Sequence, residues 1–288
     1  MNDFRIPVGD WADALVDWLT SNLSGLFGLI ADVLRWLFEL AEVVFTTPPF
    51  WVVVLVLAAV ALLAKSWKLA LATVVGLGLI FAMDQWDNAM ATIALVVVAS
   101  LIATVIAIPL GIWAARSSGV STVLRPVLDF MQTMPAFVYL LPAVILFRVG
   151  VVPGIVATII FAMAPGVRFT ELGIRQVDRE VVEAGHAFGA TPGRILRQVQ
   201  LPLALPTIMA GINQLIMLSL SMVVIAGMVG APGLGQPVVQ SLQSVNIGLG
   251  AEAGLSVVIL AMYLDRVTSA LGDRAPVSRA LKVRAAED

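Results

Sequence analysis

The chain has 288 residues, of which 60% are hydrophobic and only 12% are charged, and its formal net charge is −2. Soluble domains carry about 25% charged residues, so this composition indicates an integral membrane protein and excludes a soluble enzyme. The chain contains no cysteine and a single histidine. Disulfides, thiolate metal sites and multi-histidine metal sites are therefore excluded as well.

Residues 1–47 differ from the rest of the chain because they are both acidic and amphipathic. Residues 1–45 contain seven acidic and two basic side chains. Apolar residues recur at helical spacing from Trp11 to Leu37, and no apolar run reaches the length of about 20 residues needed to span a bilayer. We interpret this segment as one or two helices that lie at the membrane interface on the extracytoplasmic side. A helical hairpin that packs on the protein is the alternative.

Seven apolar segments follow, and they predict an all-α integral membrane protein with about seven transmembrane helices. Two short segments occupy 48–84, the main transmembrane domain occupies 85–272, and 273–288 form a C-terminal tail. Proline inside several segments is compatible with a transmembrane helix because neighbouring helices can satisfy the backbone groups that it frees. The predicted spans are 50–64, 67–83, 88–115, 127–147, 152–170, 204–229 and 249–265.

The distribution of lysine and arginine predicts the orientation of the chain in a bacterial cytoplasmic membrane. Cytoplasmic loops are enriched in these residues. If the C-terminus is inside, fourteen of the 17 basic residues lie on the cytoplasmic side, and only Arg5, Arg35 and Arg148 lie outside. The opposite orientation would place fourteen basic residues outside. We therefore expect the N-terminus outside, the C-terminus inside and residues 171–203 in the cytoplasm.

Helix-capping residues divide this cytoplasmic segment into two short helices. Asp178 can cap the first helix, and Gly189 can end it in the left-handed conformation. Thr191 can cap the second helix, which begins at Pro192 and is expected to stop before Pro202. Small residues surround the turn and would let another surface approach closely. A connector that simply lies on the surface is the alternative interpretation.

The spacing within this segment resembles the cytoplasmic loop in permease subunits of bacterial ATP-binding-cassette importers. That loop has Glu-Ala-Ala, three residues, Gly, nine residues, Ile, one residue and Leu-Pro. Here Gly185 replaces the second Ala and Val199 replaces Ile, and both changes in volume are small. The residues that carry the resemblance are Glu183, Ala184, Gly185, Gly189, Val199, Leu201 and Pro202.

Longer stretches resemble the permeases of importers for glycine betaine, proline and choline, which take up compatible osmolytes. They include MQTMPAFVYLLPAVILF at 131–147 and VILAMYLDRVTSALG at 258–272. The resemblance covers residues 85–275. It implies a permease subunit that forms the translocation pathway for such a solute and is not itself an enzyme.

The same resemblance implies that the loop at 175–202 contains a coupling helix, seated in a groove of a separate ATPase. Glu183 would make polar contacts in that groove, and Gly189 would set the turn. Arg194 and Arg197 would pair with acidic residues of the partner or with anionic lipid headgroups. The expected partners are two ATPase subunits, a second permease copy in a homodimer or close heterodimer, an extracytoplasmic solute-binding protein and the lipid bilayer, with no nucleic acid.

ATP is expected to bind the partner ATPase rather than this chain. A phosphate-binding loop needs Gly-Lys-Ser/Thr after an earlier glycine, and the surroundings of Lys65, Lys68 and Lys282 do not meet that pattern. We therefore expect no cofactor and no metal in this chain, and we expect ATP hydrolysis to take place in the partner.

Polar residues inside the predicted spans are candidates for the solute pathway, because a polar side chain in a membrane is costly. For Asn213 and Gln214, hydrogen bonds between helices are the alternative. Asp129 is expected near the inner interface, where water can solvate it. A quaternary ammonium has no N–H and is recognised by aromatic faces. Phe137, Tyr139, Phe147 and Phe161 are available for this, although most of them are expected to serve in packing. The candidate pore-lining residues are Gln132, Thr133, Asn213, Gln214, Ser219 and Ser221.

Three other functions are compatible with parts of this pattern. An importer of the same class could carry another small solute, such as methionine or a phosphonate. A secondary transporter would need acidic residues in mid-span to couple an ion, and apart from Asp129 the core spans have almost none. A channel or membrane scaffold would make the loop pattern accidental. The importer permease accounts for the loop, the orientation and the missing phosphate-binding loop together.

Overall fold

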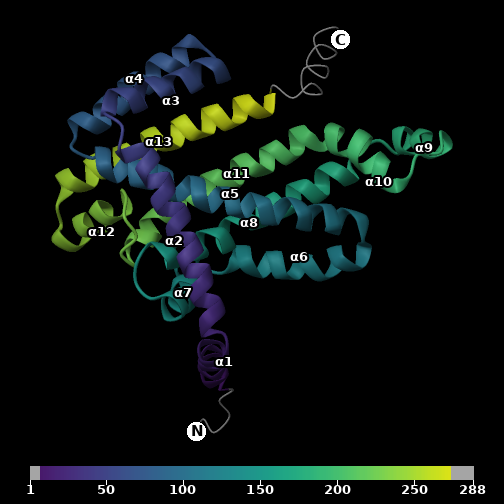
Figure 1. Cartoon of the computed structure of the whole chain (residues 1–288), viewed down its shortest axis with the longest axis horizontal. Helices are drawn as coiled ribbons and strands as arrows, with labels where there is room; N and C mark the ends of the chain where they lie inside the picture. The colour runs from purple at the N-terminus through teal and green to yellow at the C-terminus, as the bar shows by residue number, and fades with distance from the viewer. Residues whose placement is uncertain (1–6, 274–288) are drawn as a thin grey trace.

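The computed structural model describes residues 7–273, and every regular element within this range is helical. Four helices in this range are long and apolar enough to cross a membrane. They are α5 (Trp86–Arg116), α8 (Val151–Arg175), the segment Pro192–Gly227 and α13 (Ile247–Asp273). Figure 1 shows these helices running along the long axis of the molecule. They contain four of the predicted spans, so the predicted all-α fold is confirmed.

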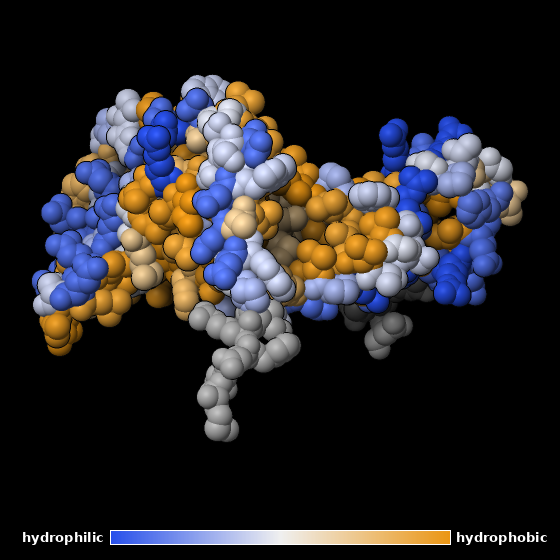
Figure 2. Space-filling model, turned by 90° about the horizontal axis from the view of Figure 1, so that it is seen from below, coloured by the Kyte–Doolittle hydropathy of each residue, from blue (hydrophilic) through white to orange (hydrophobic). Residues whose placement is uncertain are grey.

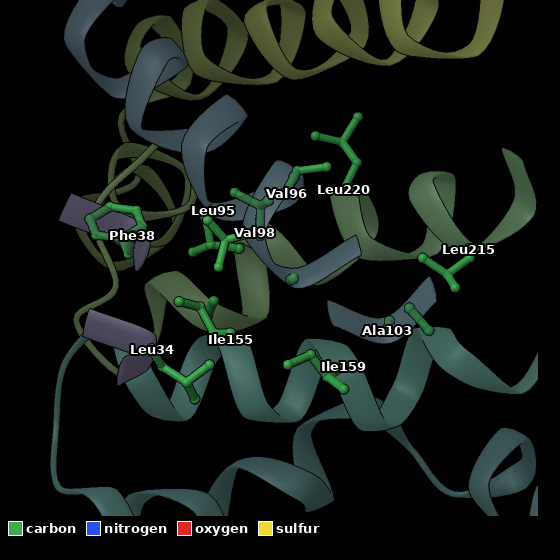
Figure 3. Close-up of a cluster of buried hydrophobic side chains, with 14 of the residues drawn as sticks. Leu34, Phe38, Leu95, Val96, Val98, Ala103, Ile155, Ile159, Leu215 and Leu220 are labelled. Carbon is green, nitrogen blue, oxygen red and sulfur yellow. The ribbon is translucent and has the colours of Figure 1, made fainter. Parts of the chain in front are cut away.

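Helix α8 packs between α5 and α11 (Leu201–Gly227) at the centre of the molecule. Leucines and isoleucines of all three helices are buried in one apolar cluster (Figure 3). Glycine brings two of the backbones together, since a Cβ at Gly111 would stand 2.5 Å from the Cβ of Thr170. Small residues at such crossings are typical of helix packing in membranes. The core therefore depends on close backbone contact as well as on apolar side chains.

The segment Pro192–Gly227 is one continuous helix of 36 residues. It consists of α10 (Pro192–Ile195), a π-helical turn (Leu196–Gln200) and α11. The prediction that the helix stops before Pro202 is therefore wrong. Pro202 has no N–H to donate to the preceding turn, and the wider π-helical turn directly before it accommodates this loss, so the helix continues.

The N-terminal segment forms two helices, α1 (Val8–Asn22) and α2 (Ser24–Thr46). Helix α2 crosses α5 and α8 instead of running beside them (Figure 1). Its inner face inserts Leu34 and Phe38 into the central core, as Figure 3 shows. The predicted helices are therefore present and one of them packs on the protein, whereas their place at a membrane interface stays a prediction.

Helices α3 (Phe50–Ala64) and α4 (Trp67–Ala82) are too short to be clear membrane spans. They have 15 and 16 residues. At about 1.5 Å per residue such a helix is about 23 Å long, less than the hydrocarbon core of about 30 Å. Helix α3 also follows α2 after a bend of 99°. Within residues 7–273 the expectation of about seven transmembrane helices is therefore reduced to four, or up to six if each bent helix pair counts as one span.

The predicted span at 127–147 is not a single helix. It is divided between α6 (Ser118–Thr133), a 3-10 turn, and α7 (Leu140–Phe147), with a bend of 106°. The break lies before Pro135, because proline disfavours the helical backbone at the residue that precedes it. Met134 accordingly has an extended backbone, with φ −67° and ψ 135°.

Two shorter helices complete the described part of the chain. Helix α9 (Arg179–Ala187) lies in the predicted cytoplasmic segment. Helix α12 (Gly235–Ser244), which the sequence does not predict, packs against α13 and α11. The predicted tail lies outside the described residues from 274 onward.

Candidate functional site

Helices α9 and α10 form one end of the molecule, beyond the apolar surface of the long helices. Figure 2 shows hydrophilic side chains gathered at this end, next to a stretch of apolar surface. The C-terminal ends of α5 and α8 meet near the same end, where the Arg175 guanidinium donates to the carbonyl oxygen of Ala114 at 2.8 Å. The polar segment is thus set apart from the apolar body of the protein.

The predicted helix, glycine turn and second helix are all present. The Asp178 carboxylate caps α9 by accepting from the backbone N–H of Glu180 at 2.9 Å. Gly189 has φ +76°, a left-handed conformation that glycine adopts without steric cost. The carbonyl of Thr191 accepts from the backbone N–H groups of Arg194 and Ile195 in α10, at 2.9 and 3.0 Å. The Thr191 side chain makes no capping hydrogen bond, so that part of the prediction is wrong.

The loop is attached to the helical core through its second helix. Ile195 and Leu196 are buried. Gly185 of α9 lies over Ile195, since a Cβ at this glycine would stand 3.3 Å from the isoleucine Cγ1. The replacement of alanine by Gly185 in the loop pattern therefore lets α9 settle closely on α10.

Phe188 is a surface residue that the sequence-based site did not include. Its side chain is 92% exposed, although phenylalanine is among the residues most often buried. It directly precedes the Gly189 turn, and Glu183 and Val181 are exposed on the same short helix. A lone phenylalanine within a polar, glycine-rich loop was the available signal. An exposed aromatic ring is suited to contact with another protein.

Arg194 and Arg197 face a common cavity. It has a volume of about 520 Å³, and Arg116 at the end of α5 also lines it. The other lining residues are Thr191, Gly193, Leu196 and Gln198, so the lining contains no acid. Three guanidinium groups without a carboxylate make this surface positively charged, and the pairing of Arg194 and Arg197 with partner acids or lipid headgroups stays a prediction.

A buried carboxylate joins α6 and α8 close to this end. Glu171 of α8, with a side chain 7% exposed, accepts from the Ser121 hydroxyl at 2.6 Å and from Arg125 at 3.3 Å, both on α6. It also pairs with Arg175 at 2.9 Å. Removing one partner of a buried ion pair costs about 3–5 kcal/mol, because the other charge is left buried and unpaired. We therefore regard this cluster as a structural connection.

A second ion pair, between Asp129 of α6 and Arg168 of α8, is much more exposed. The side chains are 64% and 39% exposed. Exposed pairs contribute only about 0–1 kcal/mol, so this pair can open at little cost. The Nε atom of Arg168 is buried and has no hydrogen-bond partner. Asp129 is therefore paired with an arginine and not simply solvated as the sequence suggested.

Arg168 also lines a cavity that brings two of the predicted pore residues together. The cavity has a volume of about 430 Å³ and lies between α6, α8 and α11. Gln132 lines it from α6, Gln214 from α11 and Phe161 from α8. Of the four aromatic residues considered from the sequence, Phe161 is among the lining residues, whereas Phe137, Tyr139 and Phe147 are not. The remaining lining residues are Pro165, Phe169 and Leu218.

The other four predicted pore residues lie elsewhere. Asn213 joins α11 to α13 by donating to Asp265 at 3.1 Å and accepting from the Thr268 hydroxyl, so the interhelical alternative holds for it. Three hydroxyl groups donate to carbonyl groups of their own helices and do not line the cavity. These are Thr133 to Phe130 at 3.2 Å, Ser219 to Leu215 at 2.9 Å, and Ser221 to Met217 at 3.0 Å.

Residues 107–274 match the protein family described as binding-protein-dependent transport system inner membrane component. The chain belongs to this family. The matched range includes the polar loop, the Glu171 cluster and the cavity beside Arg168. Family membership confirms the resemblance found in the sequence, and it does not fit the secondary-transporter, channel and scaffold alternatives.

Several similar proteins support this assignment. The glycine betaine/carnitine transport permease protein GbuB of Listeria monocytogenes is 50% identical over 94% of this chain and 97% of that protein. The glycine betaine transport system permease protein OpuAB of Bacillus subtilis is 47% identical over 92% of this chain and 94% of that protein. The glycine betaine/proline betaine permease protein ProW of Escherichia coli is 45% identical over 93% of this chain and 75% of that protein.

A solved structure shares the fold of this inner membrane component. A chain of the inward-facing MetNI methionine ABC transporter matches with a TM-score of 0.58 and 24% identity, covering 68% of this chain and 95% of that one. The inner membrane component is thus a multi-pass permease of the ABC importer class, and it works with ATPase and substrate-binding partners.

Proposed function

We propose that this permease forms the translocation pathway for glycine betaine and related quaternary amines. The observation that supports it is the 45–50% identity, over more than nine tenths of the chain, to permeases named for glycine betaine in three different bacteria. Carnitine and proline betaine appear in the names of two of these relatives. Each combines a quaternary ammonium with a carboxylate, so the solute class is a zwitterion of this kind. Choline and proline remain candidate solutes from the sequence resemblance.

We propose further that α9 is the coupling helix of the permease. Its capped N-terminus, the left-handed Gly189 and the fully exposed Phe188 present a rigid, partly apolar projection. Such a projection fits a groove on an ATPase subunit, where Glu183 would make polar contacts. ATP binds and is hydrolysed in two such partner subunits, one for each permease copy of a homodimer. The chain itself needs no cofactor in this scheme.

The proposed orientation places the α9 end in the cytoplasm and the N-terminus outside. Three arginines from α5, α10 and the π-helical turn line one cavity at that end, which agrees with the enrichment of basic residues in cytoplasmic loops. Arg35 and Arg148, which this orientation leaves outside, line a different cavity beside α2 and α7, away from α9 in Figure 1. Arg5 and the basic residues of 274–288 lie outside the described residues.

The substrate is tested by uptake in cells that express the permease together with its ATPase and solute-binding protein. We expect uptake of labelled glycine betaine that depends on ATP, with carnitine and choline as competitors and methionine as the unrelated solute. Uptake of methionine without uptake of any quaternary amine would overturn the proposed substrate class. The variant Glu183→Lys identifies the part of the uptake that depends on the permease. It reverses a charge on the exposed face of α9, so uptake should fall to the level of cells without the permease.

A further inference from the structure

The cavity between α6, α8 and α11 has the chemistry to hold a small zwitterion. We propose that it is a solute contact site within the permease, where Arg168 takes the carboxylate and the rings of Phe161 and Phe169 take the quaternary ammonium. This inference rests on the proposed function, since it supplies the place where a solute delivered by the binding protein touches the permease. It assigns separate residues to the two ends of the solute.

The cationic end of the solute is matched by the α8 side of the cavity. Phe161, Pro165, Arg168 and Phe169 are spaced at four, seven and eight residues, so they form one stripe along the helix. A quaternary ammonium cannot donate a hydrogen bond, and an aromatic face attracts it through the ring quadrupole. No acidic residue lines this cavity, so the aromatic rings are the groups that would recognise the cation.

The anionic end is matched by Arg168. Its Nε is buried without a hydrogen-bond partner, so the guanidinium has unused donor capacity. Its one carboxylate partner, Asp129, is mostly exposed to solvent and therefore holds it weakly. A guanidinium can bind a carboxylate with two parallel hydrogen bonds, and the amides of Gln132 and Gln214 line the same cavity as further donors.

Arg168 lines two cavities, so its guanidinium can exchange the Asp129 carboxylate for the carboxylate of a solute. Besides the solute cavity it lines a charged cavity of about 270 Å³ together with Asp129, Glu171 and Arg175. Glu171 is buried and already engaged by three donors, so it is not free to take part. Asp129 competes with the solute for Arg168. When the solute carboxylate pairs with Arg168, the connection between α6 and α8 through Asp129 opens.

The experiment measures binding of labelled glycine betaine to the purified permease–ATPase complex in nanodiscs, without the solute-binding protein. Choline serves as the second probe, because it has the quaternary ammonium but no carboxylate. We expect wild-type complex to bind glycine betaine at least ten-fold more tightly than choline. Arg168→Gln should weaken glycine betaine binding at least ten-fold and leave choline binding little changed. Asp129→Asn should have the opposite effect and strengthen glycine betaine binding, because it removes the competing carboxylate.

Three results would overturn the site. They are no glycine betaine binding by a wild-type complex that takes up the solute with its binding protein, unchanged binding after Arg168→Gln, or equal weakening by Arg168→Gln and Asp129→Asn. Equal weakening would mean that the ion pair only supports the structure. Phe169→Leu provides an additional variant if Arg168→Gln does not fold, and it should weaken both probes. Failure of the proposed function is recognised separately, since the complete wild-type system would then take up no quaternary amine.

Discussion

Gly211 of α11 lies so close to Phe169 of α8 that a Cβ built on the glycine would stand 2.5 Å from the Cβ of the phenylalanine. Real Cβ atoms do not approach another heavy atom this closely. The two backbones are therefore packed at a distance that only glycine permits. The same contact positions the phenylalanine that lines the proposed solute cavity.

We expect Gly211→Ala to destabilise the permease by about 1–3 kcal/mol, because the new methyl group forces the two helices apart. Thermal unfolding of the purified protein in detergent measures the effect. Gly78→Ala is the matched control, since Gly78 is also in a helix and a Cβ there meets nothing within 4 Å. Equal unfolding temperatures for the two variants would contradict the close packing.

The two ion pairs between α6 and α8 should differ in their contribution to stability. Glu171→Gln removes the buried carboxylate that Ser121, Arg125 and Arg175 share, so we expect a loss of about 1–3 kcal/mol from the hydrogen bonds to this charged group. Asp129→Asn removes an exposed partner and should cost about 0–1 kcal/mol. Chemical unfolding of both variants in the same detergent tests the difference. A larger loss of stability for Asp129→Asn than for Glu171→Gln would contradict the assignment of the Glu171 cluster as the structural connection and of the Asp129–Arg168 pair as the one that can open.

The turn after α9 should tolerate only residues that can adopt a left-handed backbone. Gly189→Pro cannot reach φ +76°, because the proline ring holds φ near −65°, and we expect solute uptake to be lost while the protein stays in the membrane. Gly189→Asn can adopt the left-handed region and should retain most uptake. Solute uptake is measured for both variants, together with the amount of each variant that is inserted in the membrane. Comparable uptake by the proline variant would refute the role of the turn.

Phe188→Ala should separate partner binding from folding. Because the side chain is 92% exposed, its loss should change the free energy of unfolding by less than about 0.5 kcal/mol. If Phe188 is an anchor in an ATPase groove, the substitution weakens association by more than about 1 kcal/mol, which is roughly five-fold in Kd. Titration of purified ATPase onto the permease measures it. Leu242→Ala, at an exposed site on α12, is the control and should leave this Kd unchanged.

The loop was predictable from the sequence to a large extent because its signals are local. Asp178 and Gly189 act on their immediate neighbours, and both behave as the sequence predicts. Pro202 and Pro135 show the limit of such rules. Both lie in apolar segments, yet the helix continues through Pro202 and breaks before Pro135. A π-helical turn accommodates the first, and no feature of composition distinguishes the two cases.

The candidate solute pathway was only partly predictable, because it depends on how the helices are rotated against one another. Gln214 and Asn213 are adjacent in the sequence and equally polar. Gln214 lines the cavity beside α8, whereas Asn213 donates a hydrogen bond to α13. The Glu171 cluster involves partners 46 and 50 residues away on α6, which sequence spacing does not reveal. Tertiary packing decides both outcomes.

The 36-residue helix from Pro192 to Gly227 has a mechanical consequence. At about 1.5 Å per residue it is about 54 Å long, and the tight contact of Gly211 with Phe169 lies close to its midpoint. Close contacts also hold this helix beside Gly173 of α8 and at Gly227, next to Gly235 of α12, so it is fixed to its neighbours at several points along its length. A displacement imposed on the α10 end would therefore be carried into α8 and α12 together, or be absorbed at the π-helical turn, where helices bend most readily.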